Sequence, residues 1–228
     1  MTDTTSPDAW ADRARPRPGA LVRLFDARLG TRLGARFAKV AAILLTLGYG
    51  IAIPFAARAP AGDGAASVLV NALGWLSWLA AGAIALSACG KQADGDALTS
   101  LALSRGFGPD AIAWARALST ARRIGSIVGV PALILALLAL GFVRRFALLP
   151  ARLALLPMTL GYVALVSVSF AALVQVARSL SAERTRWTFL LLVFVPHVLH
   201  MLLPQVPSLP WVLGRALDHL AMLGGKTL

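Results

Sequence analysis

Five long stretches of this chain contain no Asp, Glu, Lys or Arg and consist mainly of apolar side chains. A helix that crosses the hydrocarbon core of a bilayer needs about 17–25 such residues. The charged fraction of 14% is also far below the ~25% of an ordinary soluble domain. The sequence therefore predicts an integral membrane protein of the all-α class. The apolar stretches are Val40–Ala57, Gly64–Gly90, Ile124–Val143, Leu153–Ala177 and Trp187–Gly214.

The predicted architecture is a polytopic transmembrane helix bundle with five clear spans and a short or partial sixth. The fifth span should end near Leu203, because a Pro-containing turn follows it. Residues 211–225 are apolar but include Arg215, Asp218 and His219. They form either a short sixth span or an amphipathic helix that lies on the membrane surface, and Arg215 is spaced to pair with Asp218.

Three domains are expected along the chain. Residues 1–19 are rich in Thr, Asp, Pro and Arg, which is typical of a disordered cytoplasmic tail and unlike a secretory signal peptide. Residues 20–39 form an amphipathic interfacial helix. Residues 40–225 form the transmembrane helical domain, with a cytoplasmic loop at 91–123.

The helix predicted for residues 20–39 carries arginines at every fourth position, Arg28, Arg32 and Arg36, on a face separate from its leucines and phenylalanines. A basic amphipathic helix directly before a span is expected to lie in the headgroup layer. Each arginine there can gain about 1 kcal/mol from anionic lipid. We therefore expect these three side chains to face membrane lipid; the alternative is an ordinary cytoplasmic flanking helix.

The positions of Lys and Arg predict the orientation of the spans. Segments 1–39, 91–123 and 178–186 hold 8, 5 and 3 basic residues, whereas segments 58–63 and 144–152 on the other side hold 1 and 3. Because basic loops stay in the cytoplasm, the N-terminus is predicted to be cytoplasmic. The net charge of +12 also raises nucleic acid as a partner. We expect none, because the basic residues flank the apolar stretches and no basic surface interleaved with aromatic residues is visible.

The loop at 91–123 is the main polar segment between the spans, and it predicts a short helix from Asp96 to Ser104. Asp94 and Asp96 lie near its start, where negative charge favours the helix dipole. Gly106 can take the left-handed conformation that ends a helix, and Pro109 suits the first turn of the next one.

The short helix carries the apolar residues Leu98 and Leu101. An exposed helix set at an angle to the next one is suited to docking in a groove of a cytosolic partner. A solvated connector is the simpler interpretation of the same residues.

The order of residues in this loop resembles the segment between spans two and three in membrane subunits of ATP-binding-cassette exporters of the type-2 permease class. The general layout extends over residues 20–205, and the motif itself over residues 94–140. The chain departs from that pattern in lacking a Glu-rich start to the loop and in its weak last span. The residues that carry the resemblance are Asp94-Gly95, Leu98, Leu101, Arg105-Gly106, Ala111 and Ala115-Arg116-Ala117-Leu118.

The resemblance implies a permease subunit that exports a substrate across the bacterial cytoplasmic (inner) membrane. Its partners would be a second permease subunit, in a homo- or heterodimer, and a separate cytosolic ATP-binding subunit. The sequence has no phosphate-binding loop of the Walker type, since Arg105–Asp110 lacks the Gly-Lys-Ser/Thr ending. By resemblance, the loop residues that couple to the ATP-binding subunit are Asp94, Gly95, Asp96, Leu98, Leu101, Arg105, Gly106 and Arg116.

Other candidate sites are weak. His197 and His200 are three residues apart on the fifth predicted span, and such a pair can ligate a metal or haem, but packing is the simpler role. Cys89 is expected to be a packed thiol. We therefore expect no catalytic group, cofactor or metal. The alternative function is a non-transporting membrane subunit that anchors or assembles a larger complex, and an intramembrane enzyme is disfavoured for want of catalytic groups.

Overall fold

The computed structural model describes residues 18–58, 64–90, 93–141 and 153–226. This part of the chain is helical and contains no strand, which confirms the all-α prediction. The predicted disorder of residues 1–19 falls almost entirely outside the described residues, as do the connectors between the first and second and between the third and fourth spans. The elements are α2 (Pro18–Thr31), α3 (Leu33–Arg58), α4 (Gly64–Trp75), η1 (Leu76–Ala81), α5 (Gly82–Ala88), α6 (Ala93–Ser104), α7 (Pro109–Gly141), α9 (Leu155–Leu180), α10 (Thr185–Leu202) and α11 (Leu209–Lys226).

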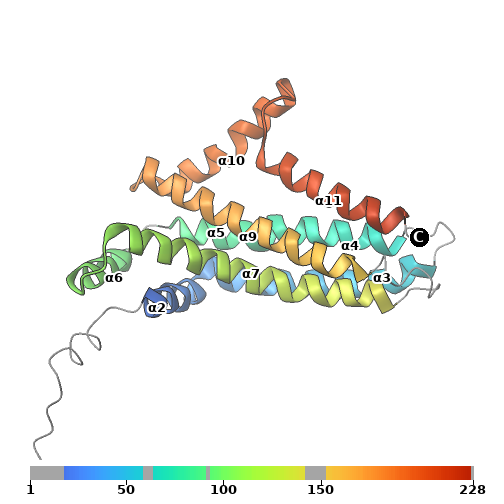
Figure 1. Ribbon diagram of the computed structural model, residues 1–228, viewed down its shortest axis with the longest axis horizontal. Coiled ribbons are helices and arrows are strands. Elements are labelled where there is room, and N and C mark those ends of the chain that lie inside the picture. Colours follow the sequence, from blue (N-terminus) through green and yellow to red (C-terminus); the bar gives the residue numbers. More distant parts are fainter. Residues whose placement is uncertain (1–17, 59–63, 91–92, 142–152, 227–228) are drawn as a thin grey trace, which may run out of the picture.

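Five of the described helical segments are long and apolar enough to cross a membrane: α3, the continuous run α4–η1–α5, α7, α9 and α10. They coincide with the five predicted spans and indicate a multi-pass membrane protein. Helices α3, α4–α5, α7 and α9 run along the same long direction in Figure 1. The third span is longer than its apolar stretch, because α7 is a single helix of 33 residues that begins in the polar loop.

Helices α7 and α9 pack closely through small residues. A methyl group added to Gly125 would lie 3.4 Å from Ser167 Oγ, and one added to Gly129 would lie 3.4 Å from Val163 Cγ1. Glycines four residues apart let two membrane helices approach at close distance. The order of these contacts, with residue number rising on one helix as it falls on the other, shows that α7 and α9 are antiparallel.

The second span contains one turn of π-helix, η1, whose residue Ser77 faces the core. The Ser77 hydroxyl donates to the carbonyl oxygen of Leu73 at 2.7 Å and lies 2.8 Å from the hydroxyl of Tyr162 on α9. Both side chains are buried, and lipid offers no hydrogen-bond partner. These bonds therefore satisfy the two hydroxyl groups within the protein.

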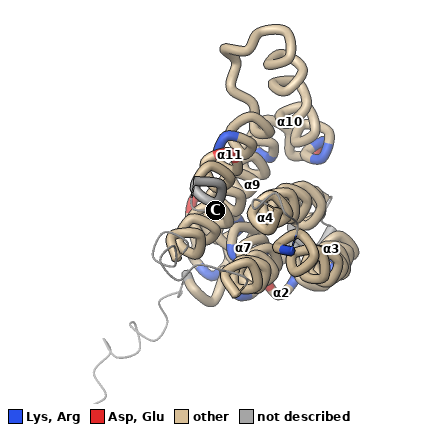
Figure 2. The backbone as a smooth tube through the Cα atoms, turned by 90° about the vertical axis from the view of Figure 1, so that its right-hand side faces the viewer, with Lys and Arg blue, Asp and Glu red and all other residues tan. Residues whose placement is uncertain are grey.

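Helix α10 departs from the direction of the other spans, and α11 returns to lie along α4 and α9 (Figure 1). Seen along the bundle in Figure 2, α10 stands apart from the group formed by α3, α4 and α7. Helix α11 buries Leu213 and Leu220 but is not one of the five membrane-crossing candidates. Its Arg215 lies over the ring of Trp211, 5.3 Å from the centroid, instead of pairing with Asp218. That α11 crosses the bilayer stays a prediction.

Candidate functional site

The predicted break between the short helix and the third span is confirmed. Helix α6 ends at Ser104, and Gly106 has a φ of 80°, the left-handed conformation expected of it. The Phe107 N–H donates to the Ala102 carbonyl at 3.1 Å, and the Gly106 N–H donates to the Leu103 carbonyl at 2.9 Å. These two bonds form a Schellman motif, which ends a helix with a sharp change of direction. Helix α7 then begins at Pro109, as predicted.

A small core fixes α6 and α2 against the start of α7. It contains Leu21 and Phe25 from α2, Ala102 from α6, and Ile112 and Ala115 from α7. Two further residues pack on it from the α6 side, Leu98 and Phe107. Because Phe107 packs on the same core as Ala102, the apolar contact that accompanies a Schellman motif is present as well.

Two leucines of α6 are exposed on different faces of the helix, because residues two apart are rotated by about 200° about its axis. Leu101 is 46% exposed and Leu103 is 50% exposed. Arg105 and Gly106, which follow them, are also exposed. Of the predicted coupling residues, Leu98 therefore faces inward, whereas Leu101, Arg105 and Gly106 are accessible. The predicted acidic start, Asp94, Gly95 and Asp96, lies outside the side chains that the structure describes.

Arg116, the last of the predicted coupling residues, joins three helices. Its guanidinium lies over the ring of Phe25 on α2, 5.3 Å from the centroid. It also donates to the hydroxyl of Thr99 on α6. Since Arg116 itself belongs to α7, a movement of α6 is coupled through this side chain to both α7 and α2.

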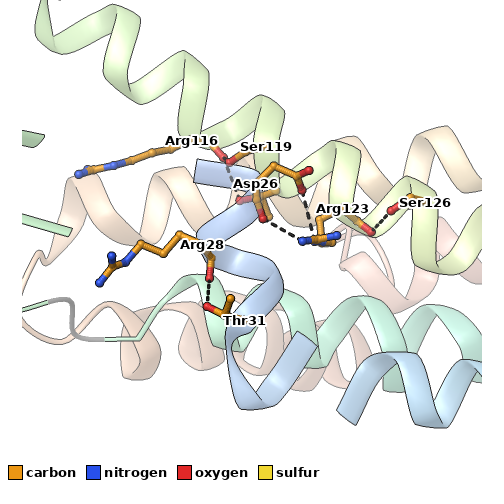
Figure 3. Close-up of polar contacts among 8 residues, drawn as sticks. Asp26, Arg28, Thr31, Arg116, Ser119, Arg123 and Ser126 are labelled. Carbon is orange, nitrogen blue, oxygen red and sulfur yellow. Dashed lines mark hydrogen bonds and ion pairs between the residues drawn. The ribbon is translucent and has the colours of Figure 1, made fainter. Parts of the chain in front are cut away.

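Arg123 connects α2 to α7 about two turns further along α7. Its Nη2 donates to the Asp26 carbonyl oxygen at 2.9 Å, and its Nε lies 3.3 Å from Asp26 Oδ1. Figure 3 shows this double contact between the two helices. Neither residue was among the predicted site residues. Asp26 is the only acidic residue between residues 13 and 62. Its isolation in a basic helix is the sequence feature that could have indicated this contact.

The three arginines predicted to face lipid lie in different surroundings. Arg36 is exposed, and its contact with lipid stays a prediction. Arg28 and Arg32 instead line a small cavity inside the protein, and Arg32 donates to the Ser87 carbonyl oxygen of α5. The physical reason is a break at Arg32, where α2 ends and α3 begins, so residues 20–39 are not one straight helix.

The cavity has a volume of about 20 Å³, enough for about one water molecule. Four arginines line it, Arg28, Arg32, Arg116 and Arg178, and we call them the arginine cluster. Arg178, near the end of α9, donates to the carbonyl oxygen of Ala88. The cluster lies at the end of the bundle that also carries α6 and α2, which we call the arginine end (Figure 1).

Cys89 lies just after the second span and is buried, as predicted. Burial raises the pKa of its thiol from 9.0 to about 11, although the positive charges of Arg178 and Arg186 act in the opposite direction. This change lowers the thiolate fraction near neutral pH roughly a hundredfold. We expect a maleimide at pH 8 to label the folded protein at least about a hundredfold more slowly than a free peptide thiol. Denaturation in SDS should restore the ordinary rate. Fast labelling of the folded chain would contradict the buried position.

The two histidines of the fifth span lie in different surroundings. His200 Nδ1 lies 2.8 Å from the Val206 carbonyl oxygen, and its ring lies against Trp211, with the centroids 5.7 Å apart. His197 is half-buried on α10. Among the described residues, no three His, Cys, Asp or Glu side chains come together as metal ligands would.

Comparisons with protein-family models, with curated proteins and with solved structures found no match to this chain.

Proposed function

We propose that this chain is the membrane-spanning permease subunit of an ATP-binding-cassette exporter, driven by ATP hydrolysis in a separate cytosolic subunit. The observation that carries the proposal is the joint between α6 and α7. A helix with two exposed leucines is followed by a tightly capped turn and then by a helix of 33 residues that crosses the bundle. A push on α6 by the ATP-binding subunit would therefore move a whole span.

Two features support this assignment of α6 as the docking element. Leu101 and Leu103 are exposed at the arginine end, beyond the apolar part of the bundle, where a cytosolic protein can reach them. Leu98 and Arg116 hold α6 on α2 and α7, so a force on the exposed leucines is transmitted to these helices. A solvated connector needs neither feature.

The proposal places the protein in the bacterial inner membrane with the arginine end in the cytoplasm. A second permease subunit would pack against apolar surface that the single chain leaves open. Such surface is present on α3, where Leu44 is 64% and Ile51 is 63% exposed, and on α10, where Phe194 is 60% exposed. In the single chain these side chains would meet lipid.

The test is purification of the tagged chain from its own host, followed by measurement of co-purifying ATPase activity. We expect a P-loop ATPase to co-purify. Leu101→Ala combined with Leu103→Ala should reduce the associated activity at least about tenfold, because truncating two central apolar contacts of a docking helix costs more than 1.4 kcal/mol.

The matched control is Leu137→Ala combined with Leu138→Ala, two exposed leucines at the other end of α7. It should leave the associated ATPase activity unchanged. Absence of any P-loop protein from the native complex would contradict the proposal and favour a membrane subunit that only anchors a larger assembly. Equal losses in the two double variants would also count against docking on α6.

A further inference from the structure

Helix α11 lies beside the second span near the middle of that span (Figure 1). A methyl group added to Gly74 would lie 3.6 Å from Leu217 Cδ1, so these two residues are at the same level. The second span runs over the 25 residues Gly64–Ala88. Its middle is Leu76, and Gly74 is only about 3 Å away along the axis at 1.5 Å per residue. Half of the hydrocarbon core is about 15 Å thick, so this part of α11 is level with the core.

Three ionisable residues lie within one turn of that contact. Arg215, Asp218 and His219 are all exposed, whereas Leu213 and Leu220 are buried against the bundle. Residues three or four positions apart share one face of a helix. Arg215, Asp218 and His219 therefore form one face, which we call the polar face of α11, and it is directed away from the bundle at the depth of the bilayer.

The polar face is not satisfied within the single chain. In the part of the chain that the structure describes, Asp218 forms no ion pair and His219 forms no hydrogen bond. Arg215 contacts the ring of Trp211 on its own helix, 5.3 Å from the centroid. Charged side chains at this depth are costly in lipid, and they almost always face another protein segment or a water-filled cavity. The polar face therefore requires a cover that the single chain does not provide.

The surroundings of the polar face favour a protein surface as this cover. The exposed residues beside it are large and apolar, namely Trp211 and Met222 on α11 and Phe194 on the adjacent α10. Water would hydrate the charges but not these side chains, whereas lipid would accommodate only the apolar ones. A protein interface with an apolar centre and paired polar groups suits both.

We infer that a second copy of this chain covers the polar face of α11. The face carries one positive and one negative side chain, so it is complementary to itself. In an interface with two-fold symmetry, a residue that contacts a second residue of the other copy has its contact repeated in reverse. Arg215 of each copy therefore pairs with Asp218 of the other, and the two ion pairs leave neither charge alone. The inference does not depend on the proposed exporter function.

The test is exchange of charges between two full-length copies that carry different affinity tags. The copies are co-expressed, the membranes are dissolved in a mild detergent, and recovery of the second tag with the first is measured. We expect the unchanged copies to purify together. Arg215→Asp in both copies, or Asp218→Arg in both copies, should reduce recovery at least about tenfold, because like charges then face each other across the interface.

The decisive measurement combines the two variants. Arg215→Asp on one tag and Asp218→Arg on the other should restore recovery, because each copy then provides the charge that the other one lacks. Restored recovery also shows that both variants fold. A pairing of Arg215 with Asp218 inside one chain cannot produce this result.

The matched control is Arg122→Asp in both copies. Arg122 is exposed near the arginine end, far along the chain from α11, so the same change of charge should leave recovery unchanged. The inference would be overturned if the unchanged copies did not purify together or if the single variants purified as well as the unchanged chain. A mixture of the two variants that stayed as low as either one alone would overturn it too. None of these outcomes bears on whether an ATPase co-purifies.

Discussion

Arg123→Met is expected to lower the free energy of unfolding by about 2–4 kcal/mol, because it leaves Asp26 without its charged partner in a mostly buried position. The side chains of Arg123 and Asp26 are only 18% and 20% exposed, so solvent screens this pair far less than a surface ion pair. The loss also removes the bond from Arg123 to the Asp26 carbonyl oxygen. Unfolding of the purified protein by SDS or by heat measures the change.

The neighbouring residue provides the control. Arg122 is exposed and adjacent in sequence, so Arg122→Met should change the free energy of unfolding by less than about 0.5 kcal/mol. Asp26→Asn combined with Arg123→Met should cost clearly less than the sum of the two single changes, as expected for groups in direct contact. Equal effects of Arg122→Met and Arg123→Met would show that the ion pair does not hold α2 on α7.

Gly34→Ala is the second change with a large expected effect. A methyl group on Gly34 would lie 2.8 Å from the Ala83 carbonyl oxygen and 2.8 Å from Ser87 Cβ, so α3 would have to move away from α5. Overpacking of this kind costs about 1–3 kcal/mol. Thermal unfolding of the purified protein measures the loss. The same shift would weaken the bond from Arg32 to the Ser87 carbonyl oxygen and disturb the arginine cluster.

The control for Gly34 is another glycine of the same helix. A methyl group on Gly48 would meet nothing within 4 Å, and alanine is a better helix former than glycine by up to about 1 kcal/mol. Gly48→Ala should therefore leave the melting temperature unchanged or raise it. If Gly34→Ala were equally well tolerated, α3 and α5 would not approach each other as closely as described.

The features that the sequence predicted correctly are those that depend on neighbouring residues. Uncharged stretches such as Val40–Ala57 fix the position of a span because transfer into lipid depends on the stretch itself. The end of α6 and the start of α7 follow from Gly106 and Pro109, whose backbone preferences are local. The predicted start of the fifth span, Trp187, lies two residues after the observed start of α10 at Thr185. The direction of α10 relative to the bundle was not predicted.

The features that were missed depend on segments far apart in the chain. Asp26 and Arg123 are 97 residues apart, and their contact exists only because α2 packs on α7. The inward position of Arg28 and Arg32 arises from the same packing and from the break between α2 and α3. Periodicity places such arginines on one face of a helix, but it cannot tell whether lipid or another helix covers that face.

The proposed exporter function requires that the arginine end of the bundle faces the cytoplasm, and sided labelling of one introduced cysteine tests this directly. Ser104 is exposed at the end of α6, so Ser104→Cys in a Cys89→Ala background presents a single accessible thiol. A membrane-impermeant maleimide should label it in inside-out membrane vesicles and leave it unlabelled in intact cells. Labelling in intact cells would place α6 on the outer side and contradict the docking of an ATP-binding subunit on it.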